Sequence, residues 1–152
     1  PQVQVVITVS PIRYAKYGFV ASGLSKATLL LATHHLLGLH PDCTSYFPAY
    51  ELMNDELRDY RFYAPDMLHP SEQAVEYIWQ RFADAYLSFS AHTFLKEWQP
   101  LQAALNHKPF NPDGAEYKAF LAKTLQDIRA LETKYGHKLD LSAYENIAKC
   151  DD

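Results

Sequence analysis

The segment Val3-Gln4-Val5-Val6-Ile7-Thr8-Val9-Ser10-Pro11 decides the fold class of this chain. It is apolar at nearly every position and rich in β-branched residues, a pattern typical of a strand covered on both faces in a parallel sheet. Proline cannot donate a hydrogen bond to a sheet ladder, so the predicted strand ends at Ser10-Pro11. The segment therefore predicts an α/β fold in which this strand has neighbours.

The next elements continue the same pattern. A helix is predicted to begin near Ser22 or Ser25 and to end by Gly38, and a second short strand is predicted over residues 43–47. A short helical piece around residues 51–57 follows. Strands separated by one helix favour a parallel sheet with a right-handed crossover. Two strands do not complete such a sheet.

The rest of the chain is predicted to be a loop followed by helices. Residues 58–69 are polar and aromatic without periodicity, which marks a candidate functional loop. A helix with one apolar face is predicted from Ser71, and its apolar positions are Val75, Ile78, Trp79, Phe82 and Tyr86. A further helix, kinked or restarted at Pro100, and a long helix ended by Gly136 follow. We expect residues 1–89 to belong to the α/β domain and residues 90–152 to form a helical appendage.

Composition excludes several classes of protein. With 152 residues, 48% of them hydrophobic and 21% charged, the chain has the size and composition of a single globular domain. A net charge of -4 argues against nucleic-acid binding. No apolar run approaches the roughly 18 residues of a membrane span. The sequence therefore predicts neither a nucleic-acid partner nor a membrane span.

Cysteine and histidine usage argues against a disulfide framework and a metal site. Cys43 and Cys150 are the only cysteines and lie far apart. They are compatible with a reducing compartment, which favours the cytoplasm. His34 and His35 are adjacent on a predicted helix and point in different directions, so they do not form a two-histidine metal site. The chain has no glycine-rich phosphate loop, and we expect no cofactor.

The strongest candidate for catalysis is the pair Asp66 and His69. Open α/β sheets place ligands at loops that leave the carboxyl ends of strands. In such a loop, a carboxylate three residues before a histidine would accept a hydrogen bond from one ring nitrogen, while the other nitrogen faces substrate as a general base. In the alternative interpretation, Asp66 caps a turn and His69 is a surface residue. Spacing alone leaves both open.

Three further residues are candidates. Arg13, after the first predicted strand, would orient an anionic or carbonyl group of the substrate, or else form a surface or loop-bracing ion pair. Arg61, between Tyr60 and Phe62, would do the same or stack on an aromatic ring. Ser10 is an alternative nucleophile, but Ser-Pro lacks the glycine-flanked turn that exposes an activated serine.

Four segments together resemble the carboxyl-terminal half of a GSCFA-family protein, a family that belongs with the SGNH/GDSL-like hydrolases. The resemblance covers most of residues 5–82 and is specific in order and spacing, and residues 107–112 of the tail also resemble the family. The four segments are Thr8-Val9-Ser10-Pro11-Ile12-Arg13, residues 24–32, Tyr46-Phe47-Pro48-Ala49-Tyr50-Glu51, and the run from Asp59 to Pro70 that contains Asp66-Met67-Leu68-His69.

The resemblance implies a three-layer flavodoxin-like parallel sheet and a serine hydrolase acting on small-molecule or carbohydrate esters. It makes Asp66 and His69 the last two members of a catalytic triad. The family's Gly-Ser-Cys-Phe-Ala motif, whose serine would be the nucleophile, does not occur in these 152 residues. We therefore expect an amino-terminal half of the same protein to complete the sheet and supply the nucleophile and oxyanion hole, and we expect the 152 residues alone to be inactive.

Two functions of other classes stay open. One is a non-catalytic interaction module in which the helical tail supplies a partner surface. The other is a glycan-binding module that retains the fold without the nucleophile. A glycine-flanked serine upstream, after a buried strand, would distinguish the hydrolase from both.

Overall fold

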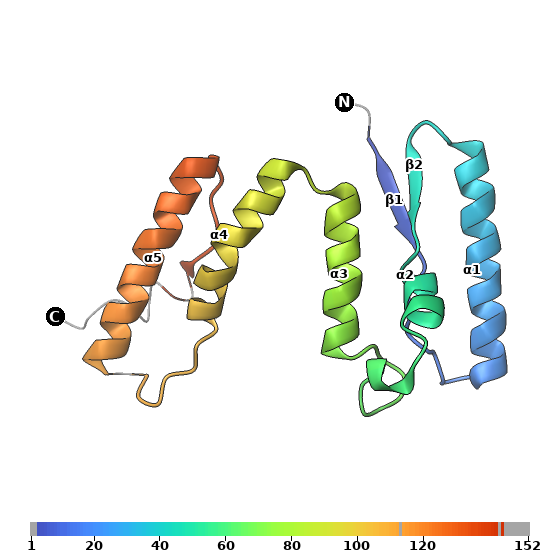
Figure 1. The fold of residues 1–152 in the computed structure, drawn as a ribbon, viewed down its shortest axis with the longest axis horizontal. Helices are drawn as coiled ribbons and strands as arrows, with labels where there is room; N and C mark the ends of the chain where they lie inside the picture. Colours follow the sequence, from blue (N-terminus) through green and yellow to red (C-terminus); the bar gives the residue numbers. More distant parts are fainter. Residues whose placement is uncertain (1–2, 113, 143, 145–152) are drawn as a thin grey trace. The chain divides into compact units, whose positions relative to one another are not determined.

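The computed structural model describes residues 3–112, 114–142 and 144 (Figure 1). The chain divides into two compact units, residues 1–86 and residues 87–152. Each unit has its own set of elements. Within the described residues, no helix combines the length and apolar character that a membrane crossing requires.

The first unit is built on a β-α-β motif. Strand β1 (Val5–Thr8) and strand β2 (Thr44–Phe47) are parallel and joined by helix α1 (Phe19–Leu39). In the register of the pair, Val5 lies opposite Thr44 and Thr8 opposite Phe47. Figure 1 shows the two strands side by side. Helix α1 connects the end of β1 to the start of β2 and lies beside β2. The parallel pair and its helical crossover confirm the mixed α/β class predicted from the sequence.

The expectation that the first strand is covered on both faces is wrong for the part of the chain that the structure describes. Val5 and Val6 are 44% and 38% exposed, whereas Val9, just after β1, is buried. The faces of a strand are buried by layers packed on the sheet, and the described residues leave Val5 and Val6 partly uncovered. The β-branched pattern therefore indicated a strand correctly but did not show what covers it.

Helix α1 begins earlier than either serine predicted as its start. Gly18, with a φ of 85°, precedes the first helical residue Phe19. Ser22 does not cap the helix, because its hydroxyl accepts a hydrogen bond from the Tyr14 backbone N–H at 3.2 Å. This contact ties the loop before α1 to the helix, and Ser22 is buried.

The chain after β2 forms a compact helical layer that positions the candidate loop. Helix α2 (Ala49–Glu51) continues into a π-helical turn, η1 (Leu52–Glu56), and a 3₁₀ turn, η2 (Tyr60–Phe62), precedes helix α3 (Glu72–Tyr86). Buried residues from η1, from the position just after it and from α3 form the core of this region, and they are Met53, Leu57 and Ala74. The segment between η2 and α3 contains Asp66 and His69, so this core fixes both ends of their loop.

The apolar face of α3 packs against β2 through aromatic rings. The Phe82 ring lies 5.1 Å from the Phe47 ring, centre to centre, and nearly perpendicular to it. The Tyr86 hydroxyl donates to the Tyr46 carbonyl at 3.3 Å. Trp79, predicted to be in the core, is 43% exposed and stacks on Phe82.

The second unit is a pair of helices, α4 (Phe89–Leu105) and α5 (Ala115–Tyr135). Pro100 lies inside α4, so the helix does not restart there as one alternative predicted. Gly136 ends α5 as predicted, in the left-handed conformation with a φ of 70°. The helices share a core of apolar residues, and its buried members are Leu105, Leu121, Leu125, Ile128 and Leu141.

Candidate active site

The loop that contains Asp66 and His69 is closed at its neck by backbone hydrogen bonds. Tyr63 and Pro70 form an isolated antiparallel bridge. Inside it, the Ala64 N–H donates to the His69 carbonyl at 2.8 Å, and the Met67 N–H donates to the Ala64 carbonyl at 2.9 Å. Residues 64–69 therefore form a tight turn whose ends are pinned, rather than an open loop.

The Asp66 side chain caps the backbone of this turn. Its Oδ1 accepts hydrogen bonds from the N–H groups of Leu68 at 2.9 Å and His69 at 3.0 Å. This is the geometry by which aspartate side chains stabilise turns. Met67, between them, has a φ of 61°, the left-handed region that non-glycine residues rarely adopt. The capping hydrogen bonds hold the chain in this unfavourable conformation.

The other Asp66 oxygen faces the His69 ring. Oδ2 lies 2.5 Å from Nδ1 of His69. The backbone N–H groups of His69 and Leu68, followed by the His69 side chain, lower the pKa of Asp66 from 3.8 to about 2. Asp66 is therefore an ionised acceptor at neutral pH. Asp66 therefore caps the turn, as in the second interpretation, and also contacts the imidazole, as the first requires, while the catalytic role of the pair stays a prediction.

The second ring nitrogen of His69 is accessible. The His69 side chain is 58% exposed, and among the described residues no group forms a hydrogen bond with Nε2. His69 also lies at the edge of a cavity of about 330 Å³ whose walls are largely apolar. Residues of the β1–α1 loop and of α3 line the cavity, among them Pro11, Ile12, Val75 and Ile78. The His69 residue therefore has apolar space beside it for part of a substrate.

Arg13 braces the same turn from the β1–α1 loop. Its backbone N–H donates to the Leu68 carbonyl at 3.0 Å, and Nη1 donates to the Met67 carbonyl at 3.2 Å. The guanidinium also lies over two aromatic rings, 4.7 Å from the Phe19 centroid and 5.4 Å from the Tyr63 centroid. The bracing occurs through hydrogen bonds to carbonyl groups, not through an ion pair.

Arg13 also lines a second, more polar cleft of about 290 Å³. Arg58, Asn54 and Tyr60 lie along the same cleft. The predicted contact of Arg13 with an anionic or carbonyl group of the substrate stays a prediction.

Arg61 and Ser10, the other two candidates, take no part in the hydrogen bonds between Asp66 and His69. The Arg61 guanidinium lies 4.8 Å from the Phe62 ring centroid, as in the stacking alternative, and its backbone N–H donates to Asp59. The Ser10 hydroxyl accepts a hydrogen bond from the Ile12 N–H at 3.3 Å and lines the cavity that His69 borders. Within the described residues, no group of three or more His, Cys, Asp or Glu side chains is arranged to hold a metal ion.

Sequence reasoning missed two features of the site. The left-handed Met67 carries no signal in the sequence, because methionine has no preference for that conformation. Val75 and Ile78 were predicted only as apolar residues of a helix face, whereas they also form a wall of the cavity. Apolar periodicity predicts burial but does not show that an apolar face borders a site.

The fold and the site define an α/β chain with an exposed carboxylate–histidine pair on a braced turn. Comparison with known families places the chain in one of them. The family model described as the GSCFA family matches residues 1–82, and the model of the GSCFA domain protein, C-terminal domain, matches residues 98–145. The chain therefore belongs to the GSCFA family. No curated protein and no solved structure matched the chain.

Proposed function

We propose that this chain supplies the general base of a serine ester hydrolase, with His69 as the base and Asp66 as its partner. The observation that carries the proposal is the 2.5 Å contact between His69 Nδ1 and Asp66 Oδ2. An ionised Asp66 selects the tautomer with the proton on Nδ1, which leaves a lone pair on Nε2. The His69 side chain is 58% exposed, and the residue borders a cavity.

The proposed reaction is acyl transfer to a serine and then to water. Nε2 of His69 removes the proton of the serine hydroxyl while Oγ bonds to the ester carbonyl carbon. The tetrahedral intermediate collapses and expels the alcohol, which takes the proton back from the imidazolium. Water then attacks the acyl-serine in the same way and releases the acid. Asp66 stabilises the imidazolium in both halves and stays ionised throughout.

In this proposal the nucleophile lies upstream, in a part of the protein outside the 152 residues. Ser10 supports this placement, because its hydroxyl accepts from the Ile12 N–H within a Ser-Pro turn instead of lying on a glycine-flanked one. The unpaired edge of β1 is a second support, since β2 is the only strand paired with β1 among the described residues and an edge strand leaves backbone groups open to pairing. We propose that strands of the upstream part pair beside β1 and complete a three-layer flavodoxin-like fold of the SGNH type.

The cavity beside His69 indicates the size and polarity of the acyl group in the proposed substrate. Its walls are apolar and its volume of about 330 Å³ is at the lower end for small-molecule sites. The proposed substrate is therefore an ester with a short acyl group, carried on a small alcohol or a carbohydrate. Ile12, Val75 and Ile78 would contact the acyl chain.

The proposal is tested by ester hydrolysis. The polypeptide extended by its upstream sequence is assayed on short-chain p-nitrophenyl esters beside its His69→Ala variant. We expect turnover that falls by about 10⁴-fold or more in the variant. His34→Ala is the matched control, because His34 is an exposed histidine of α1. Equal loss in both variants, or full activity without His69, would contradict the proposal.

A further inference from the structure

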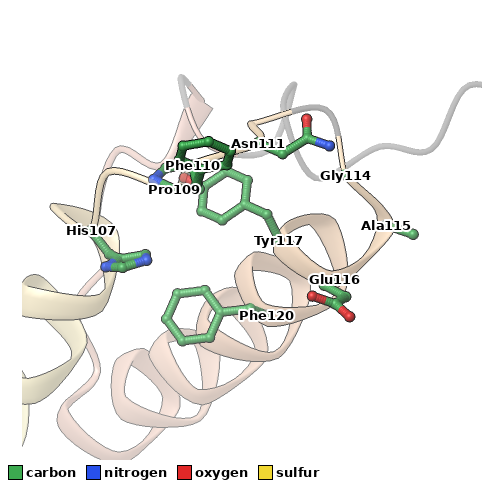
Figure 2. A pocket seen from close by; sticks show the side chains of 9 residues that line it. All are labelled: His107, Pro109, Phe110, Asn111, Gly114, Ala115, Glu116, Tyr117 and Phe120. Atoms are coloured by element: carbon green, nitrogen blue, oxygen red, sulfur yellow. The ribbon is translucent and has the colours of Figure 1, made fainter.

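The second unit contains a cavity that the proposed hydrolase does not use. It lies between the end of α4 and the first turns of α5 and has a volume of about 720 Å³, in the range of small-molecule sites. Four aromatic side chains line it, and they are His107, Phe110, Tyr117 and Phe120. Figure 2 shows the rings of His107, Tyr117 and Phe120 around the same open space.

The rings are held in a fixed relation to one another. Tyr117 and Phe120 are three residues apart on α5, and their ring centroids are 6.4 Å apart with an interplanar angle of 27°. The His107 ring lies 5.9 Å from the Phe120 ring at 68°, in an edge-to-face contact. Tyr117 also packs on the core of the unit, so the floor of the cavity is anchored. Two nearly parallel ring planes therefore form one side of the cavity.

These aromatic rings are more exposed than structural packing requires. Phe120 is 43% exposed, and the Phe110 side chain is fully exposed. Exposed aromatic rings are unfavourable in water, and their clustering around one cavity marks a contact surface for an apolar face of a ligand. Neither ring contributes to the buried core of the unit.

Polar side chains at the cavity are free to bind. Asn111 and Glu116 line it, and within the described residues neither side chain forms a hydrogen bond or an ion pair. An amide offers both donors and acceptors, and a carboxylate offers acceptors only. The lining contains no lysine or arginine, which argues against a phosphate or another anion. Rings rather than aliphatic chains argue against a lipid acyl chain.

We propose that this cavity binds a neutral saccharide. A pyranose ring has one face of C–H groups, which the negative face of an aromatic ring attracts, and hydroxyl groups around its edge. In the proposed complex, Tyr117 and Phe120 contact that face, Phe110 covers the sugar from the loop, and Asn111 and Glu116 bond to hydroxyls. A glycan that contains such a saccharide would bind to the second unit, whether or not the first unit hydrolyses esters.

Ligand-observed NMR and calorimetry on the full chain test the proposal. The probes are cellotriose, chitotriose and mannotriose, titrated to millimolar concentration. We expect at least one to bind, with Kd raised about tenfold by Phe110→Ala or Phe120→Ala, as expected for the loss of one aromatic contact of about 1.4 kcal/mol. Phe89→Ala is the matched control, because Phe89 is an exposed aromatic residue of α4 outside the cavity.

Circular dichroism and thermal unfolding establish that each variant is folded. Phe110 has no buried contact to lose, so Phe110→Ala decides the question if Phe120→Ala unfolds the unit. The proposal is overturned if no trisaccharide binds. It is also overturned if binding is unchanged in folded Phe110→Ala, or if tetramethylammonium binds to the cavity in preference to the sugars, because an aromatic cage for organic cations would show that behaviour.

Discussion

Nδ1 of His69 lies 2.5 Å from Oδ2 of Asp66, while Oδ1 of the same carboxylate holds the backbone between the two residues. One side chain thus sets both the shape of the turn and the orientation of the imidazole that the turn carries. The arrangement is compact, because a three-residue separation brings the carboxylate and the ring together without a long-range contact. It explains why an exposed histidine has a defined orientation in this chain.

The first prediction concerns Asp66 as the partner of the base. Asp66→Asn replaces an ionised acceptor by an amide that can donate to Nδ1 and so favours the wrong tautomer of His69. We expect kcat of the extended polypeptide to fall by roughly 10³- to 10⁴-fold. Steady-state kinetics measure this loss, and Asp55→Asn serves as the control, because Asp55 is an exposed aspartate of η1. A loss of less than about tenfold would show that Asp66 only shapes the turn.

The second prediction concerns acid stability. The pKa of Asp66 is lowered from 3.8 to about 2 in the folded chain, so the ionised carboxylate stabilises the fold above pH 3.8. This contribution is lost as the pH falls from about 4 toward 2. Asp66→Asn should therefore lower Tm at pH 6, and the difference from the unmodified chain should shrink over that acid range. A Tm difference independent of pH would contradict the lowered pKa.

The third prediction concerns the pH dependence of hydrolysis. Asp66 is ionised down to about pH 2, so its protonation does not limit the rate in mildly acidic solution. An imidazolium cannot accept the serine proton, and we therefore expect kcat/KM to fall on the acid side well above pH 2. A pH–rate profile measures this. A rate that stays flat from acid to alkaline pH would rule out an imidazole base.

The fourth prediction concerns Arg13 as a positioning residue. Arg13→Lys keeps the charge but loses the planar group that stacks on Phe19 and Tyr63 and bonds to the turn. We expect kcat to fall by about 10- to 100-fold. Hydrogen exchange at the Leu68 and His69 amides should accelerate at the same time. Arg61→Lys is the matched control, and unchanged exchange in Arg13→Lys would show that the turn does not need the brace.

The fifth prediction concerns the left-handed backbone of Met67. A non-glycine residue in this region costs about 1–2 kcal/mol, whereas glycine adopts it freely but loses more entropy on folding. Met67→Gly should therefore raise the free energy of unfolding by up to about 1 kcal/mol, and Met67→Ile should lower it. Urea denaturation measures both. Stabilisation by isoleucine would contradict the assigned backbone conformation.

The sequence predicted those features that depend on local patterns. The β-branched run before Pro11 predicted β1, the apolar spacing after Ser71 predicted α3, and Gly136 predicted the end of α5. In each case the local preference of the residues and the tertiary structure agree. The pairing of Asp66 with His69 was also a local inference, since it joins residues three positions apart.

Features set by distant contacts could not be predicted in the same way. Ser22 has the character of a helix cap, but its hydroxyl bonds to the Tyr14 backbone and α1 begins at Phe19. The brace from Arg13 to Met67 joins residues 54 positions apart, so no spacing rule indicates it. Burial of Val5 and Val6 depends on what packs over the faces of the sheet, which a pattern along one strand does not locate.

Labelling with a fluorophosphonate probe tests whether His69 activates an upstream serine, because the probe reacts with a serine only when a base activates it. The extended polypeptide and its His69→Ala variant are labelled side by side, and the modified residue is located by mass spectrometry. We expect a single labelled serine upstream of residue 1 and no labelling without His69. Labelling of Ser10, or labelling that persists in His69→Ala, would contradict it.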